Sequence, residues 1–514
     1  MIIAILFCLF LFVSLHYIIL HYGKYGKIVN SLPGPSTLPI IGNIHHVLIS
    51  SSDLWAYLNK MSDQYYPIFK IWSFTSALIH IRHPNDLQII LGNLKFTEKG
   101  YMYKLLRPWF STGLLTSSEH KWKIRRKILT SAFHFDMLNR FVDVFVKEAE
   151  ILAISFKSEE GLIVNDLLNS INKHTLNIIC ETTMGISLKD GDELRHKYLR
   201  AETSMQEVFA YKIARPWLLY DFFLKFDPQG WRETKLLETL NAFTGKIIEE
   251  RKEYHEQSNG RYLTDINKNS NDDSDNVESN DVGTRKRKLA LLDVLIDAYR
   301  NNQIDDEGIR EEVNTFMFAG HDTTSVAICY VIMLLAEHKE IQDRARAEAK
   351  AVLKENEGKV NMSTLQDLSY LERCIKESLR LYPSVPRISR SLKKDQELSN
   401  RRLPPTTEIL VGIYNAHRDP QYWPNPDVFD PDRFLPENSE SRHPYAYIPF
   451  GAGSRNCIGK RFAMLELKTI MCLLLNSYSF EPVDYLKDIS FLMGMVLKPA
   501  HPIRIKFIPI KDTC

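Results

Sequence analysis

The fold of this 514-residue chain is decided by one stretch near its C-terminal end, Phe450-Gly451-Ala452-Gly453-Ser454-Arg455-Asn456-Cys457-Ile458-Gly459. Glycines close to a cysteine let backbone N–H groups approach its sulfur, which steadies it as a thiolate. Arg455 adds a permanent cation two residues before the cysteine. The run 460–467 reads as a helix, so its positive N-terminal end also faces the sulfur. The stretch therefore predicts a thiolate held in a rigid loop at a helix N-terminus.

Several chemical roles compete for Cys457. A buried structural cysteine in a turn is the usual fate of a lone cysteine. A nucleophilic cysteine needs a partner histidine, and the sequence shows no Cys–His signature of known spacing. Gly451 and Gly453 suggest a dinucleotide-binding loop, but the third glycine of that fingerprint and its βαβ context are missing. An axial ligand to haem iron is the remaining role.

The stretch resembles the haem-binding decapeptide of the cytochrome P-450 superfamily. The resemblance implies that Cys457 is the axial ligand of the iron in haem b, since members of that superfamily ligate haem through a cysteine thiolate. The positions that match the superfamily pattern are Phe450, Gly453, Arg455, Cys457 and Gly459.

The resemblance also implies which cations bind the haem propionates. Trp122 and Arg126, at i and i+4 of a basic helix, reach one propionate, and Arg390 and Arg455 reach another. Guanidinium groups suit this role because they stay charged and bind carboxylates in a fork.

A long apolar stripe begins at Asp306 and continues at helical spacing for about thirty residues. Its middle reads Ala319-Gly320-His321-Asp322-Thr323-Thr324, and Gly, Asp and Thr are poor choices for a helix interior. An ordinary kink in a buried helix is one interpretation. In the other, small residues open a groove while Asp322 and Thr323 relay protons. The segment resembles the acid–alcohol motif on the superfamily's distal helix.

A further group is assigned to structure and not to chemistry. Glu377 and Arg380 fall on one helix face at i and i+3, where most such pairs are solvated. The superfamily's Glu-x-x-Arg and Pro-x-Arg-Phe motifs imply that Arg433 joins them in one network.

The segment 312–324 is similar to the signature of family 4 of the superfamily, whose best-known members hydroxylate fatty acids at the terminal carbon. The mixed residue usage of the chain resembles that of invertebrate members. Asn314 stands where Asp is usual, and Ala319 replaces the Glu that in many members forms an ester to a haem methyl. Alanine has no carboxylate, so we expect non-covalent, extractable haem. Arg387 stands where an apolar residue is common; it could steer an acidic substrate, but we expect it to snorkel to solvent. Other segments similar to that family are 174–181 and 289–293.

The N-terminal residues 1–22 predict a transmembrane signal anchor. From Ile2 to Leu20 there is no Lys, Arg, Asp or Glu, close to the roughly 20 apolar residues that span a bilayer. A cleaved signal peptide normally has a basic start and a small-residue cleavage site, and neither is present. Lys24 and Lys27 follow the apolar run, which by the positive-inside rule leaves the body in the cytoplasm. We expect a single-pass protein of the endoplasmic reticulum membrane.

Residues 23–45 read as a proline-rich hinge, because the density of prolines excludes a helix and favours a stiff, extended path. Residues 46–514 form the predicted haem-thiolate domain. Within them, 264–288 is rich in Asn, Asp and Ser and reads as a mobile loop. Its basic end, 285–288, suggests a targeting signal or a solvated helix start, and we favour the helix start.

The remaining patterns predict a mainly α fold with small β-sheets, a single large catalytic domain behind the anchor. Helical runs occupy 139–156 and 236–251, and β candidates 68–81, 408–414 and 502–508. Lys+Arg 65 against Asp+Glu 63 leaves a net charge of +2, so no field favours nucleic acid. Seven scattered cysteines do not form a disulfide framework, which favours a reducing compartment.

Together the resemblance implies a monooxygenase that inserts one oxygen atom from O2 into a lipophilic substrate. Electrons would come from NADPH through a flavoprotein reductase, with cytochrome b5 as a further donor, since the chain has no flavin or nicotinamide motif. A basic face for that partner is predicted from Lys121, Lys123, Arg125, Lys127, Lys460 and Arg461, with a merely solvated face as the alternative. Two other classes stay open: a haem-thiolate isomerase or dehydratase acting on peroxides without reductase, and a non-catalytic haem or lipid binding protein.

Overall fold

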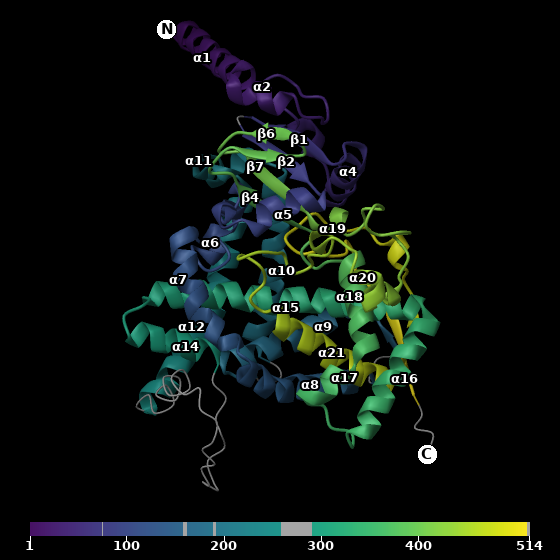
Figure 1. The fold of residues 1–514 in the computed structure, drawn as a ribbon. Coiled ribbons are helices and arrows are strands. Elements are labelled where there is room, and N and C mark those ends of the chain that lie inside the picture. Colours follow the sequence, from purple (N-terminus) through teal and green to yellow (C-terminus); the bar gives the residue numbers. More distant parts are fainter. Residues whose placement is uncertain (75, 158–161, 189–191, 259–289, 511–514) are drawn as a thin grey trace.

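The computed structural model describes residues 1–74, 76–157, 162–188, 192–258 and 290–510. The predicted mobile loop over 264–288, with its basic end, lies outside these described residues. The body is mostly helical with small sheets, as the sequence predicts, and the elements from both halves of the chain interleave in it (Figure 1).

Long helices build most of the body. The predicted helical runs 139–156 and 236–251 both lie inside such helices. Their bounds are α1 Ile2–Tyr22, α4 Ser51–Gln64, α5 Pro84–Gly92, α7 Glu119–Thr130, α8 Phe135–Lys157, α9 Leu167–Ile179, α10 Glu193–Ile213, α12 Pro228–Gln257, α14 Leu291–Arg300, α15 Asp306–Glu337, α16 Lys339–Glu355, α18 Ser369–Leu381 and α21 Lys460–Ser477.

Short helical turns connect these helices. The α-helical ones are α2 Lys24–Asn30, α3 Ile44–Val47, α6 Arg107–Phe110, α11 Asp221–Lys225, α17 Met362–Asp367, α19 Ile413–Ala416 and α20 Pro436–Ser439. A π turn, η5 Cys180–Met184, extends α9. The 3-10 turns are η1 Leu94–Phe96, η2 Tyr101–Leu106, η3 Ser131–Phe133, η6 Pro216–Leu219, η7 Pro431–Phe434, η8 Pro444–Ala446 and η9 Leu486–Asp488.

The largest sheet has the strand order β1-β2-β7-β4, so β4 is one of its edge strands. β1 (Ile68–Ser73) and β2 (Ser76–Ile81) are antiparallel, β2 runs parallel to β7 (Glu408–Gly412), and β4 (Arg387–Ser391) pairs antiparallel with β7. The predicted β segments 68–81, 408–414 and 502–508 all contain strands, but the first is divided into β1 and β2, residues 413–414 begin the helix α19, and the last strand, β9, starts only at Ile505. The smaller sheets consist of β3 (Ile163–Val164), β9 (Ile505–Pro509) and β8 (Tyr478–Pro482), and of β5 (Gln396–Leu398) and β6 (Arg401–Leu403).

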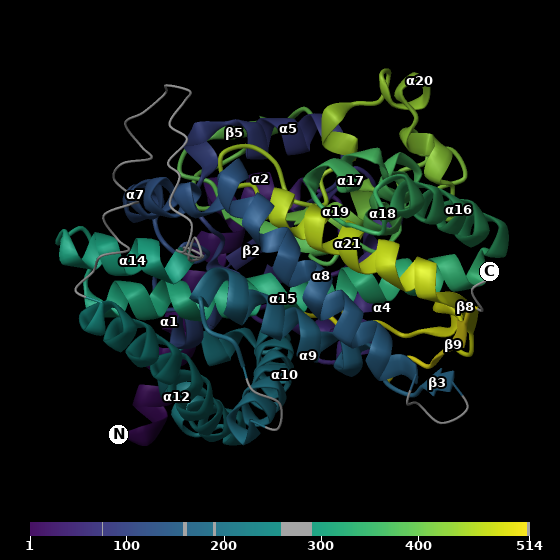
Figure 2. The same ribbon diagram turned by 90° about the horizontal axis from the view of Figure 1, so that it is seen from below.

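The helix α15 runs through the middle of the body and packs against α9, α12 and α21 (Figure 2). It begins after Asp305, whose carboxylate accepts the N–H of Gly308 at 2.8 Å and so caps the first turn. The helix α15 is long and apolar enough to suit a membrane span, but 83% of its most apolar window is buried inside the protein. It is therefore the central core helix.

The helix α1 lies at one end of the molecule, away from the helical body (Figure 1). Large apolar side chains on it are exposed, among them Ile3 (83%) and Phe12 (68%). An exposed helix of such residues leaves a large apolar surface uncovered, which in water is unfavourable.

The predicted hinge is not extended throughout, because α2 makes its first part helical before the prolines begin. It is also held against the body. Asn30 Oδ1 accepts a hydrogen bond from Trp72 Nε1 at 2.9 Å, and the carbonyl of Leu32 accepts one from Lys70 Nζ at 2.6 Å. The segment therefore docks on β1.

The ion pair of Glu377 and Arg380 is fully buried on α18 and makes two hydrogen bonds, at 2.7 and 2.8 Å. Arg380 also donates to the carbonyls of His417 (2.9 Å) and Pro426 (2.6 Å), so it ties α18 to the segment after β7. Arg433 Nε lies 3.3 Å from Glu377 Oε1. The three side chains of the predicted network thus meet, and both partners of the buried pair are satisfied.

We predict that Arg380→Met lowers the free energy of unfolding by about 3–5 kcal/mol, because Glu377 is left as a buried charge without its partner. The matched control is Lys359→Met, since Lys359 pairs with Glu357 at the surface, where such pairs contribute about 0–1 kcal/mol. Chemical denaturation of both variants is the measurement. Equal losses in the two variants would contradict the structural assignment.

Candidate active site

The cysteine loop between η8 and α21 is held by its own backbone. The N–H of Cys457 donates to the carbonyl of Phe450 at 2.9 Å, and Gly451 and Gly453 have φ of +68° and +69°. A Cβ at Gly453 would lie 1.8 Å from the carbonyl oxygen of Leu91, whereas one at Gly451 would meet nothing closer than 3.9 Å. Gly453 is therefore required by the packing of the loop on α5.

Cys457 has exposed surface, although its sulfur lies deep enough that protein atoms crowd around it. Burial raises the pKa of its thiol, while the N–H of Gly459 and the charges of Arg126 and Lys460 act to lower that pKa. A metal cation bound to the sulfur would offset the burial cost, because a coordinated thiol loses its proton. The surroundings of Cys457 therefore fit a metal ligand.

Arg126 on α7 clamps the loop next to the sulfur. Its Nη1 donates to the carbonyl of Asn456 at 2.8 Å, and its Nη2 donates to Asn456 Oδ1 at 3.0 Å. Trp122, one turn earlier and buried, packs its ring 4.4 Å from the Arg455 guanidinium. The propionate contact that the resemblance implies for both residues stays a prediction, and the structure shows that both also contact the cysteine loop.

Three cations, Lys99, Arg390 and Arg455, gather beside the loop. Arg455 donates to the carbonyls of Thr97 (3.0 Å) and Ser117 (2.7 Å), and Lys99 pairs with Arg390 in a β-bridge. Burial is the largest cause that lowers the pKa of Lys99, and the positive charge of Arg390 is the next. The same two causes lower the pKa of Arg455 to about 9. Among the described residues no carboxylate lies within 4.0 Å of their nitrogens. The cluster therefore fits an anionic group such as the propionates of haem.

Lys99 carries no motif and was missed by the sequence reasoning. It precedes the 3-10 turn η2, far in sequence from β4 and from the cysteine loop, and it joins them only through the fold.

An interior cavity of about 140 Å³ lies against α15. Ala319 and Thr323 face it from that helix, and its other walls are mostly apolar. Gly320 does not open the groove that its small size suggested. A Cβ there would lie 2.2 Å from Ile179 Cδ1, so Gly320 lets α9 approach closely.

Arg387 lines the same cavity and corrects the expectation that its side chain snorkels to solvent. Only 8% of the residue is exposed, and its guanidinium packs 4.4 Å over the ring of Trp55. The buried end of β4 holds it away from water.

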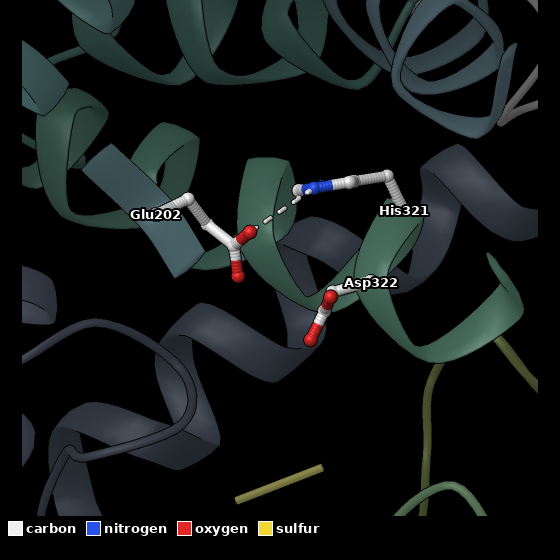
Figure 3. A group of neighbouring side chains, drawn as sticks. All are labelled: Glu202, His321 and Asp322. Carbon is white, nitrogen blue, oxygen red and sulfur yellow. Dashed lines mark ion pairs between the residues drawn. The ribbon is translucent and has the colours of Figure 1, made fainter. Parts of the chain in front are cut away.

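Asp322 faces away from that cavity, into a buried cluster with Glu202 and Lys498. Lys498 Nζ lies 2.6 Å from Asp322 Oδ1 and 3.8 Å from Glu202 Oε1, and Gln206 Nε2 donates to Asp322 Oδ2 at 3.1 Å. Figure 3 shows the His321 ring directed toward the Glu202 carboxylate, with an Nε2–Oε2 distance of 3.9 Å. The positive charge of Lys498 lies close to both carboxylates, in the role that a bound metal ion would have.

Glu202 retains a proton more readily than an ordinary exposed carboxyl does. Burial, with the charge of Asp322 adding to it, raises the pKa of Glu202. Burial acts to lower the pKa of Lys498, but Asp322 and Glu202 raise it, so the ammonium stays charged. The sequence pointed to Asp322 but gave no signal for Glu202, Gln206 or Lys498, which come from α10 and a distant loop.

Thr323 is adjacent to Asp322 in sequence, but the two side chains have different partners. The Thr323 hydroxyl donates to the carbonyl of Ala319 at 2.8 Å on the cavity side of the helix. The pair therefore connects a buried charged cluster on one side of α15 with the apolar cavity on the other.

Haem has an iron, which an accessible cysteine can bind, and two carboxylates, which can pair with the nearby group of cations. The geometry thus defines a haem protein with a mostly helical fold. A family model described as Cytochrome P450 matches residues 32–507.

Known relatives agree over nearly the full length. Cytochrome P450 4c21 of Blattella germanica is 37% identical over 494 residues, which cover 95% of this chain and 96% of the relative. Cytochrome P450 4c3 of Drosophila melanogaster is 37% identical, with 94% and 90% covered. Cytochrome P450 4V2 of Homo sapiens is 34% identical, with 91% and 87% covered. The chain belongs to the cytochrome P450 family, and it is a haem-iron monooxygenase.

We predict that Gly453→Ala prevents normal haem incorporation and lowers the unfolding free energy by more than about 3 kcal/mol, because strain in the left-handed region adds to the clash with Leu91. Gly451→Ala is the matched control. It has the same backbone strain without the clash, and we expect a loss of about 1–2 kcal/mol. Haem content per polypeptide and denaturation midpoints are measured for both. Indistinguishable variants would refute the packing argument.

Proposed function

We propose that Cys457 is the axial ligand of haem b and that the protein inserts one oxygen atom from O2 into a lipophilic substrate. Electrons come from NADPH through a flavoprotein reductase. The observation that carries the proposal is the group of Lys99, Arg390 and Arg455 beside the Cys457 loop, since no carboxylate of the described residues lies within 4.0 Å of these buried and half-buried cations.

Each part of the site has a role in this reaction. Bound haem supplies the chemistry on O2, which side chains cannot provide. Cys457 holds the iron, the cationic group holds the propionates, and Arg126 fixes the loop through Asn456. The apolar walls around Thr323 bind substrate and exclude water.

Protons reach the site through the Asp322 cluster. Gln206 and Lys498 line a cleft of about 1260 Å³ and also contact the Asp322 carboxylate. A proton from the cleft can therefore pass by Glu202 and Lys498 to Asp322. Thr323, the next residue along α15, lines the cavity that would receive the proton. Neither an isomerase nor a haem carrier needs such a supply, which favours the monooxygenase.

Haem is held without an ester in this proposal. Ala319 lines the cavity at the position where the family-4 signature has a glutamate, and its methyl group cannot form the bond.

The surface supports a membrane location. We infer that residues 1–22 form a single-pass anchor in the endoplasmic reticulum membrane, that 23–45 link it to the body, and that the domain 46–514 is cytoplasmic. Aromatic side chains on α11 and at the start of α12 are exposed and suit a lipid interface, and α11 lies on the α1 side of the body (Figure 1). They are Phe222 (67%), Phe226 (71%) and Trp231 (62%).

The reductase, and cytochrome b5 as a second donor, would dock on a smaller basic face than the sequence indicated. Arg125 is buried, and Lys121 pairs with the buried Glu311 at 2.6 Å, so neither is free for a partner. The exposed cations that remain are Lys123, Lys127, Lys460 and Arg461.

We predict that Cys457→Ser abolishes the red-shifted Soret band that the reduced, carbon monoxide-treated protein shows when a thiolate binds the iron. Product formation by the unaltered protein should require both NADPH and reductase. Cys472→Ser, at a buried cysteine of α21, is the control and should keep the band. Oxygenated product without reductase would instead support the peroxide-dependent classes.

We predict a pH effect from Glu202. Its folded pKa lies above the unfolded carboxyl value, so its stabilising contribution is present below about pH 4.5 and is lost as pH rises through the folded pKa. In Glu202→Gln this pH-dependent loss of stability is absent. Between pH 5 and pH 8 the unfolding free energy of the variant should therefore fall by about 1 kcal/mol or more less than that of the parent. Turnover should also drop roughly 10-fold or more.

The control is Glu207→Gln, on the same helix but at the surface, where Glu207 pairs with Arg232. Stability is followed by denaturation at each pH. Parallel pH profiles for the parent and Glu202→Gln would remove Glu202 from the proton route.

A further inference from the structure

Exposed cations from two segments far apart in sequence meet beside the end of α1. Lys24 and Lys27 lie on α2, and Arg401 is the first residue of β6. Figure 1 shows α2 and β6 at the end of the molecule that carries α1. All three residues are exposed, so a ligand outside the protein can reach them. Among the described residues, no carboxylate lies within 4.0 Å of their charged nitrogens.

The three cations follow the length of α2. Lys24, Lys27 and Ser31 are spaced at i, i+3 and i+7, which places them on one face of the helix and its C-cap. Arg401 Nη1 donates to the carbonyl of Ser31 at 3.1 Å. The guanidinium therefore lies at the C-terminal end of α2, one turn beyond Lys27. We call Lys24, Lys27 and Arg401 the basic ridge.

The helix α2 lies across the end of α1 and does not extend away from it. Asn30 Nδ2, at the far end of α2, donates to the carbonyl of His21 at 3.0 Å. Gly26 packs against the same end of α1, since a Cβ there would clash with the carbonyl oxygen of Leu20. Both ends of α2 are thus beside the last turn of α1, and the basic ridge is level with the end of that apolar helix.

The acidic residues of the β5–β6 hairpin do not neutralise the ridge. Asp395 pairs with Arg402, and Glu397 lies opposite Arg402 in the strand register. Successive residues of a strand point to opposite faces, so Arg401 and Arg402 are on different sides of the hairpin. Both carboxylates therefore accompany Arg402, and the charge of Arg401 is left for the ridge.

The hairpin also fixes the ridge to the body. Arg401 is paired in the register with Leu398, and Ser399, in the turn between them, donates its N–H to Asp86 Oδ1 of α5 at 2.9 Å. A ligand that binds Lys24, Lys27 and Arg401 together would therefore contact both the helix after α1 and the globular body.

A bilayer around α1 would place its headgroups at the level of the ridge, because headgroups lie where an apolar spanning helix ends. Cations within a Debye length of a membrane surface, about 8–10 Å at moderate salt, attract anionic headgroups. An arginine adds geometric specificity, since its planar fork matches a phosphate. Charge, level and exposure of the ridge all suit an anionic phospholipid.

We propose that Lys24, Lys27 and Arg401 form a binding site for the headgroup of an anionic phospholipid, and that this contact fixes the orientation of the body on the bilayer. The inference rests on the proposed membrane anchor and adds to it a preference among lipids.

The test uses the haem-loaded, full-length protein in phosphatidylcholine vesicles that contain a trace of one spin-labelled lipid. The label is on phosphatidylserine, phosphatidylglycerol or phosphatidylcholine. Electron paramagnetic resonance gives the fraction of each lipid that the protein immobilises, and from it a relative association constant. We expect both anionic lipids to associate roughly 5- to 10-fold more strongly than phosphatidylcholine at low salt, and the preference to fall towards unity in 1 M salt.

The variant that combines Lys24→Gln, Lys27→Gln and Arg401→Gln removes the charge of the ridge. We expect its preference for anionic lipid to fall to within about 2-fold of unity, while association of phosphatidylcholine stays as in the parent. The double variant without Arg401→Gln should keep a weaker preference. The haem Soret band of each variant shows that the body is folded.

The matched control combines Lys350→Gln, Lys354→Gln and Lys359→Gln, which removes the same number of charges. These exposed lysines lie on or just after α16, at the end of the body far from α1 (Figure 1). The control should keep the full preference.

Three results would overturn the inference: no preference in the parent, a preference that survives loss of the ridge, or an equal loss in the control. A response to phosphatidylserine alone would also contradict it, because the ridge recognises charge. Failure of the proposed anchor is distinguishable, since an alkaline wash would then release the protein from vesicles of either lipid. Failure of the proposed reaction is distinguishable too, because lipid association requires no turnover.

Discussion

The cost of burying charge orders this structure. Glu377 and Arg380 are both fully buried and satisfy each other, and their contacts to backbone carbonyls fasten α18 to the loops that lead to the cysteine. Lys99, Arg390 and Arg455 are a group of a different kind, because the described residues supply Arg390 and Arg455 with carbonyls and supply none of the three with a carboxylate. A site that is unfavourable without its ligand favours binding of that ligand, so the cofactor contributes directly to the stability of the fold around it.

The central helix separates two environments. One side of α15 meets the apolar cavity through Ala319 and Thr323, and the other meets a buried cluster of Asp322, Glu202 and Lys498. Poor helix formers are tolerated in its middle because tertiary contacts stabilise them: Gly320 admits Ile179 of α9, and Thr324 donates to Glu466 of α21 at 3.2 Å. Residues that weaken the isolated helix thus allow it to pack closely against α9 and to make a polar contact with α21.

The sequence predicts those parts of the site that lie within short segments. The loop around Cys457, the pair of Glu377 and Arg380 and the acid–alcohol segment are each local, and their residue types alone indicate their chemistry. It could not predict Lys99, Glu202 or Lys498, since each becomes a partner only when elements distant in sequence pack together. Arg387 shows the same limit. Snorkelling is the common behaviour of a long cation, and only the pairing of β4 with β7 keeps it buried.

The two arginines of β4 lie on opposite faces of the strand. Arg387 and Ser389 share one face, while Arg390 lies on the other, beside Lys99 and Arg455. Because strand geometry is rigid over so short a distance, the backbone of this one strand fixes how a group bound at Arg390 is placed relative to the cavity that the other face of β4 lines.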